Sequence, residues 1–194
     1  MRDRILTIPN ILTLSRLPLA VLLFACIAYE WWLIGLIVFV AASLTDWLDG
    51  FLARKLNQQS ALGRNLDPLI DKVLVGGAFI YLMAVPGAQL LPWMVTVVIG
   101  RELLITGIRG IMEAQAMKFG ADWLGKIKMG LQCVVLIDVL ATMWLRTFEL
   151  SPDTSKALWY LQIALIYLML LATVASGLQY IVKAIRLWNS APTA

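Results

Sequence analysis

Four aspartates form the most distinctive chemical pattern in this 194-residue chain. They make two pairs, Asp46 with Asp49 and Asp67 with Asp71, and spacings of three and four residues place each pair on one face of a helix. Four carboxylates in an apolar setting repel one another unless they are protonated or bound to metal. Carboxylate oxygens select hard cations, and two divalent ions balance four negative charges. The pattern therefore predicts a site for Mg²⁺, Mn²⁺ or Ca²⁺.

The residues beside the first pair indicate what such ions would hold. Gly50, Ala53 and Arg54 continue the face on which Asp46 lies. Small side chains let a pyrophosphate approach the backbone, and a guanidinium matches phosphate oxygens. The polar connection over residues 55–65 is expected to turn the chain back, so that the two acidic faces look at each other across a helical hairpin.

The composition limits where this site can be. Hydrophobic residues make up 61% of the chain and charged residues only 14%, which excludes a soluble domain, a disordered chain and a secreted disulfide scaffold. The absence of histidine excludes imidazole catalysis and histidine-ligated zinc or haem. Cys26 and Cys133 lie in apolar stretches and are interpreted as small buried hydrophobes. A net charge of +4 on such a chain favours an orientation signal or an anionic substrate over nucleic-acid binding.

The apolar stretches predict the helices that position the aspartates. Residues 11–45 would make a helix of roughly 52 Å, too long for a hydrocarbon core of about 30 Å, so we expect two helices that turn at residues 29–32. Pro86 and Gly87 divide residues 73–100 into two more. Further spans are expected at about 125–145 and 157–182. The chain is thus predicted to be an all-α integral membrane protein of six transmembrane helices, one domain over 1–194 with a juxtamembrane segment at 1–8.

The basic residues predict the orientation. If the N-terminus is cytoplasmic, the opposite side holds only Arg146 and Lys156 among the lysines and arginines. Both termini and the active site are therefore expected to face the cytoplasm. The apolar stretch after Pro9 runs into a second one, so no cleavable signal peptide is expected. A compact multi-pass chain without a transit peptide is typical of the bacterial inner or cell membrane.

The aspartate pattern resembles a known family. Asp46-x₂-Asp49-Gly50-x₂-Ala53-Arg54-x₈-Gly63-x₃-Asp67-x₃-Asp71 is similar to the complete signature of the CDP-alcohol phosphotransferases, which share a six-helix architecture. The resemblance implies two ions, Mg²⁺ or Mn²⁺, held by all four aspartates, with Asp71 also acting as general base. It implies a homodimer. It also implies that six residues contact the CDP group: Asn10, Thr13, Gly50, Ala53, Arg54 and Ser60.

A set of cations in the second half suggests the acceptor. Arg101 and Arg109 lie two turns apart on roughly one face of the fourth span, and Lys126 and Lys128 open the fifth. All four are predicted to lie toward the cytoplasmic side, where the aspartates are. Such a cluster suits an acceptor that carries a phosphate.

The segments that carry these cations, residues 100–109 and 125–128, resemble the phosphatidylglycerophosphate synthase subfamily, and so does the segment at residues 8–16. That resemblance implies transfer of a phosphatidyl group from CDP-diacylglycerol to sn-glycerol 3-phosphate, giving phosphatidylglycerophosphate and CMP. A cardiolipin synthase that uses phosphatidylglycerol is the nearest alternative, and inositol-phosphate or serine acceptors follow.

A divalent-cation transporter is the alternative from another class. It predicts acids near the bilayer midplane that recur in both halves of the chain. The second half contains no matching pair, and Asp138 is its only acid in the middle of a span. Release of CMP with each alcohol in turn would distinguish these functions.

Overall fold

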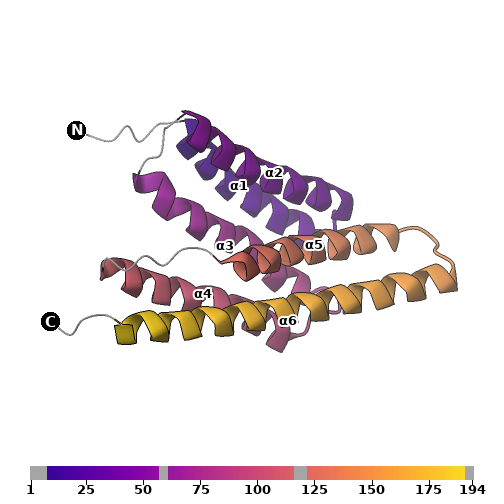
Figure 1. The fold of residues 1–194 in the computed structure, drawn as a ribbon. Helices are drawn as coiled ribbons and strands as arrows, with labels where there is room; N and C mark the ends of the chain where they lie inside the picture. The colour runs from indigo at the N-terminus through magenta and orange to yellow at the C-terminus, as the bar shows by residue number, and fades with distance from the viewer. Residues whose placement is uncertain (1–7, 57–60, 116–121, 191–194) are drawn as a thin grey trace.

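The computed structural model describes the backbone of residues 8–56, 61–115 and 122–190, and the side chains within 14–45, 69–115 and 122–189. This part of the chain is all-helical (Figure 1). Its helices are α1 (Ile8–Ala28), α2 (Trp32–Leu56), α3 (Ala61–Met83), α4 (Pro92–Ala114), α5 (Trp123–Leu145) and α6 (Pro152–Ser190).

The predicted breaks between helices are confirmed. Between α1 and α2, Glu30 adopts a φ of 59°, and the amide of Trp31 donates to the carbonyl of Cys26 at 2.8 Å. Between α3 and α4, Gly87 has a φ of 89°, a left-handed conformation that costs glycine least. Proline at the first position of α4 suits a helix start, because its missing N–H would have no partner there.

The last helix is longer than expected. α6 has 39 residues, or about 58 Å at 1.5 Å per residue, and extends past the predicted span 157–182 at both ends. No proline or glycine at either predicted boundary stops it. The extension carries Lys183 beyond the apolar segment, toward the end of the bundle where the charged residues gather.

The helices pack around one main apolar core. α1 contacts both α2 and α3, α5 contacts α2 and α6, and α4 contacts α3 and α6. Direct packing of α2 on α3, expected for the acidic hairpin, is not among the helix contacts found in the described residues. The core side chains come from all six helices and are completely buried or nearly so, and they include Leu23, Phe39, Phe79, Val98, Leu136 and Met169.

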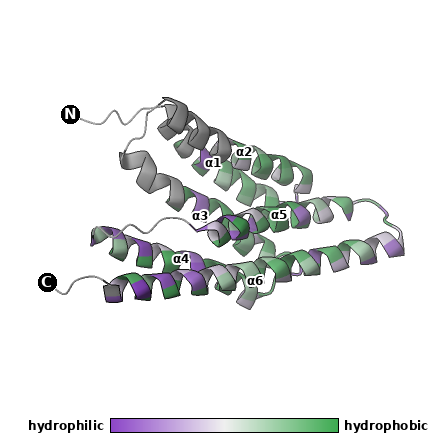
Figure 2. Ribbon diagram, viewed as in Figure 1, coloured by the Kyte–Doolittle hydropathy of each residue, from purple (hydrophilic) through white to green (hydrophobic). Residues whose placement is uncertain are grey.

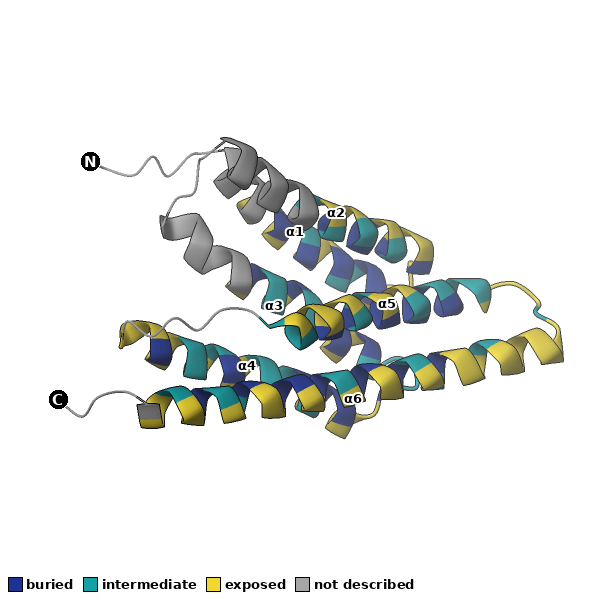
Figure 3. Cartoon of the chain, viewed as in Figure 1, coloured by how far each residue is buried: buried dark blue, intermediate teal, exposed yellow. Residues whose placement is uncertain are grey.

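The outward faces are also apolar. Val21 is 66% exposed and Leu171 69% exposed, and Figures 2 and 3 show exposed hydrophobic positions along several helices. A bilayer can cover such surface, whereas water cannot do so without cost. Among the described residues, α5 and the 152–189 part of α6 are long and apolar enough to cross a membrane.

The helical segments that carry the predicted aspartate pairs lie at one end of the bundle. In Figure 1, α2, α4 and α6 finish and α1, α3 and α5 begin toward the same side. Figure 2 shows that hydrophilic positions of α4 and α6 gather toward this end. We call it the polar end, and it contains the helical segments that carry the four aspartates.

Candidate active site

Asp71, the predicted general base, is held by an arginine from another helix. The Asp71 carboxylate on α3 accepts a charge-assisted hydrogen bond from the Arg16 guanidinium on α1. The Arg16 side chain is completely buried, and that of Asp71 is 22% exposed. A buried guanidinium needs an anionic partner because burial removes its water shell. The pair therefore fixes the acidic part of α3 against α1.

The remaining aspartates lie on the predicted helices. α2 continues without interruption through Asp46 and Asp49, and α3 through Asp67 and Asp71. Each pair thus has the helical spacing on which the metal prediction depends. The side chains of Asp46, Asp49 and Asp67 lie outside the described residues, so the two-metal site stays a prediction.

The predicted CDP contacts also fall outside the described side chains. Asn10 and Thr13 lie in the first half of α1, and Gly50, Ala53 and Arg54 in the second half of α2. Ser60 lies outside the described residues altogether. Arg16 follows Asn10 and Thr13 on α1 and is the described residue that connects this helix to Asp71.

Glu102 gathers cations from two helices. Its carboxylate accepts from Arg101 Nη1 at 3.1 Å on the same helix and from Lys128 Nζ on α5. Lys128 is only 5% exposed, and its ammonium also donates to Gln132 Oε1 at 3.4 Å. This carboxylate therefore ties α4 to α5 in the interior of the bundle.

Lys72 connects the charged residues around Glu102 to α3, the helix that carries Asp71. It follows Asp71 on α3, and its ammonium donates to Thr106 Oγ1 on α4. Lys72 interacts electrostatically with Asp71 and with Arg101, Arg109 and Glu102. The cations of α4 and α5 consequently lie next to the segment that carries Asp71.

Tyr180 on α6 contacts the arginines of α4 and the backbone just before α5. Its hydroxyl accepts from the backbone amide of Asp122 at 2.9 Å and from Arg109 Nη2 at 3.4 Å. Its ring centroid lies 5.5 Å from Arg101 Cζ and 5.9 Å from both Arg109 Cζ and Lys183 Nζ. Lys183 also donates to Asp122 Oδ1 at 2.6 Å.

Among the described residues around Glu102 and Tyr180, cations outnumber the acids that form salt bridges with them. We define the basic cluster as the cations that surround Glu102 and Tyr180: Lys72, Arg101, Arg109, Lys128 and Lys183. Among the described residues, Glu102 and Asp122 form salt bridges with its members, and Lys72 also interacts electrostatically with Asp71. Among the described residues, Arg101 Nε and Nη2 and Arg109 Nε are buried and lack a hydrogen-bond partner. Unpaired buried donors are costly, and an anion such as phosphate would satisfy them.

The predicted acceptor residues are partly brought together. Arg101, Arg109 and Lys128 belong to the basic cluster, whereas the Lys126 side chain is exposed. Side chains two positions apart on a helix point in nearly opposite directions, so Lys126 does not share the inward face of Lys128.

Several members of the site were missed by sequence reasoning. Arg16 gave a signal, because a charge in a long apolar run needs a partner. Glu102 gave a weaker one beside Arg101. Tyr180 and Lys183 gave no sequence signal, because an aromatic residue and a lysine near the end of a helix are ordinary features of a membrane helix.

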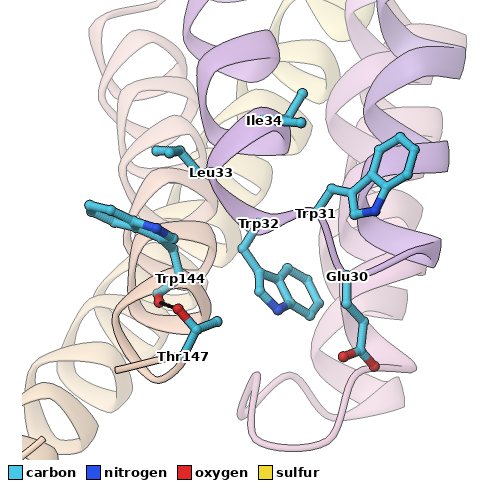
Figure 4. Close-up of a pocket in the computed structure, with 7 residues that line it drawn as sticks. All are labelled: Glu30, Trp31, Trp32, Leu33, Ile34, Trp144 and Thr147. Carbon is cyan, nitrogen blue, oxygen red and sulfur yellow. Dashed lines mark hydrogen bonds between the residues drawn. The ribbon is translucent and has the colours of Figure 1, made fainter. Parts of the chain in front are cut away.

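The cavities at the other end of the bundle lack comparable chemistry. One of about 320 Å³ lies between the α1–α2 turn and the end of α5. Figure 4 shows it lined by aromatic and aliphatic side chains, with Glu30 as its charged residue and Thr147 bonded to the carbonyl of Trp144. Tryptophans at this position suit the membrane interface, as predicted for the turn at residues 29–32.

Comparison with known proteins decides the family. The sequence profile described as CDP-alcohol phosphatidyltransferase matches residues 6–190. The chain belongs to this family. The predicted resemblance is thereby confirmed, and membership together with the two long apolar helices indicates a membrane protein.

Relatives of this CDP-alcohol phosphatidyltransferase carry a more specific name. The CDP-diacylglycerol–glycerol-3-phosphate 3-phosphatidyltransferase of Bacillus subtilis (strain 168) is 40% identical over 153 residues, which cover 78% of this chain and 73% of the relative. That of Salmonella choleraesuis (strain SC-B67) is 33% identical over 189 residues, covering 91% and 94%. A chloroplastic/mitochondrial relative from Arabidopsis thaliana is 38% identical over 155 residues, covering 72% and 52%.

Proposed function

We propose that this protein transfers a phosphatidyl group from CDP-diacylglycerol to sn-glycerol 3-phosphate and releases phosphatidylglycerophosphate and CMP. The names of its relatives support this reaction. The observation that carries it is the partly buried basic cluster, in which Lys72 lies next to Asp71 on α3 and contacts α4. A phosphate monoester carries more negative charge than a serine or a phosphodiester, so it suits several cations best.

The aspartates would hold the metal ions. Members of this family generally use divalent ions, and the carboxylate donors of Asp46, Asp49, Asp67 and Asp71 fit two ions, which we propose are Mg²⁺ or Mn²⁺. When bound, such ions neutralise charge on the donor pyrophosphate and on the departing CMP. The proposed CDP contacts are the residues named above on α1, on α2 and at Ser60.

The chain's own groups would then position the acceptor. Arg101, Arg109 and Lys128 bind the phosphate of glycerol 3-phosphate and orient its 1-hydroxyl toward the phosphorus that carries diacylglycerol. The Asp71 carboxylate accepts the hydroxyl proton as the new P–O bond forms and the bond to CMP breaks. Arg16 holds the Asp71 carboxylate in place through these steps.

We further propose a six-span arrangement with both termini and the polar end at the cytoplasmic face of a bacterial inner or cell membrane. The basic residues of the polar end support this orientation. A lipid-tailed donor and a water-soluble acceptor would meet there. The homodimer remains a proposal from family resemblance, and cross-linking in native membranes would test it.

The decisive experiment measures CMP release by purified protein with CDP-diacylglycerol, Mg²⁺ or Mn²⁺, and one acceptor at a time. Glycerol 3-phosphate is expected to give the highest kcat/KM, and EDTA should abolish release. A preference for phosphatidylglycerol would instead indicate a cardiolipin synthase. If no acceptor supports CMP release while the protein moves divalent ions across vesicles, the transferase function is wrong.

A further inference from the structure

The aromatic ring of Tyr180 lies where the cations of α4 meet the last helix. Arg101, Arg109 and Lys183 all approach this ring, and the tyrosine is only 2% exposed. Its hydroxyl contacts Arg109 and the backbone amide that precedes α5. One side chain therefore joins α4, α6 and the start of α5.

The ring attracts guanidinium groups without using their N–H donors. A cation is drawn to the π-face electrostatically, whereas a carboxylate would form hydrogen bonds with the guanidinium edge. Within the described residues, Arg101 keeps Nε and Nη2 without a partner, and Arg109 keeps Nε. The Arg101 side chain is 90% buried, with 10% exposed. The guanidinium groups are thus held while donors stay available for an anion.

The backbone around Tyr180 is shaped for this contact. A Cβ at Gly125 on α5 would lie 3.4 Å from the Tyr180 hydroxyl. A Cβ at Gly177, one turn before Tyr180 on α6, would lie 3.2 Å from Arg101 Cγ. Glycine at these two positions lets the tyrosine and the arginine stem fit between the helices.

We propose that Tyr180 is a positioning residue for the acceptor phosphate. It orients Arg101 through its ring and Arg109 through both its ring and its hydroxyl, which makes the final third of α6 part of the acceptor site. The inference rests on the proposed function, because it assigns the phosphate to the acceptor. Tyr180 itself acts through the arginines.

The test compares Tyr180→Phe, which keeps the ring, with Tyr180→Leu, which removes it. Loss of the hydroxyl contact with a charged partner should raise the KM for glycerol 3-phosphate about tenfold. Loss of the ring should raise it about a hundredfold. The KM for CDP-diacylglycerol should stay within about twofold of the parental value, since the donor is expected at the aspartate helices. Tyr167→Phe and Tyr167→Leu are matched controls, because Tyr167 lies on the same helix and is 48% exposed.

A second readout does not depend on turnover. Inorganic phosphate, without donor or metal, should raise the thermal unfolding temperature of the parental protein. The phosphate concentration that gives half of this rise should be lowest for the parental protein, higher for Tyr180→Phe and highest for Tyr180→Leu. If the KM for glycerol 3-phosphate and the phosphate effect are both unchanged in Tyr180→Leu, the proposal is overturned. Equal losses for donor and acceptor, accompanied by a lower melting temperature of the ligand-free protein, would indicate a purely structural role and would also overturn it.

The outcomes separate this inference from the proposed function. If parental protein fails to use glycerol 3-phosphate, the proposed acceptor is wrong. The phosphate titration alone then tests the role of Tyr180. A loss of the phosphate effect that grows from Tyr180→Phe to Tyr180→Leu supports a role in anion binding, and an unchanged effect contradicts it.

Discussion

Replacing Arg16 by methionine should destabilise the metal-free protein and make its stability depend on divalent ions. The substitution keeps an unbranched side chain but removes the guanidinium that pairs with Asp71. The Asp71 carboxylate, whose side chain is only 22% exposed, then loses this partner. A metal ion bound at Asp71 would supply positive charge in place of Arg16, so Mg²⁺ should restore much of the lost stability.

The burial of the two side chains sets the size of the effect. Removing one partner from a buried ion pair costs about 3–5 kcal/mol. Arg16 is completely buried, but the Asp71 side chain is 22% exposed, so the loss should be near the lower limit, about 3 kcal/mol. For a chain of this length that corresponds to a fall of about 6–12 °C in melting temperature. Excess Mg²⁺ should reduce the difference between variant and parent.

Thermal unfolding in mild detergent can be followed with a thiol-reactive fluorophore. Cys26 is a completely buried free cysteine on α1, the helix that carries Arg16, and it becomes reactive when α1 separates from the bundle. Arg146→Met is the matched control, since Arg146 is exposed at the other end of the bundle and should change stability by less than about 1 kcal/mol.

A double-mutant cycle gives the result that would refute this reasoning. Arg16→Met is combined with Asp71→Asn, and the cost of removing the guanidinium is measured in both backgrounds. If Arg16→Met costs the same free energy whether residue 71 is aspartate or asparagine, the two side chains are not coupled. Equal sensitivity of variant and parent to Mg²⁺ would likewise contradict the link between Arg16 and the metal site.

Three further predictions follow from the site and the fold. Asp71→Asn should lower the rate of CMP release by at least about a hundredfold, because a general base is lost, and a parental rate in folded protein would show that the base is another group. Arg109→Ala should raise the KM for glycerol 3-phosphate about tenfold or more, because a charge-assisted contact is lost, and an unchanged KM would exclude Arg109 from the acceptor site. Gly87→Ala should lower the unfolding free energy by about 1–2 kcal/mol, because a Cβ at this positive φ is strained and would meet the Arg146 guanidinium. Denaturant titration measures this change, and an unfolding free energy equal to the parental value would contradict the prediction.

The helices and their breaks were predictable because local features control them. The long apolar run had to turn, and the aromatic segment at residues 29–32 does so. Pro86 and Gly87 mark the next break, since neither residue favours a helix interior. The boundaries of α6 were harder to predict, because no breaker residue stands at either end of the predicted span 157–182, and the helix continues past both.

The partners of charged residues were not predictable in the same way. The sequence indicates that Arg16 needs an anion, but the partner lies 55 residues away on another helix. Arg109 and Tyr180 are separated by 71 residues and meet because α4 packs against α6. Contacts over such separations depend on how helices cross, and single-sequence periodicity carries no information about that crossing.

The sequence by itself determined the aspartate spacing, the family and the apolar character of the chain, because these depend on residue type and on neighbours within a few positions. Only the tertiary structure decided that Arg16 pairs with Asp71, that Glu102 and Tyr180 organise the cations, and that Lys126 lies apart from them. The physical reason is that a buried charge must be neutralised by whichever groups helix packing brings within a few ångströms.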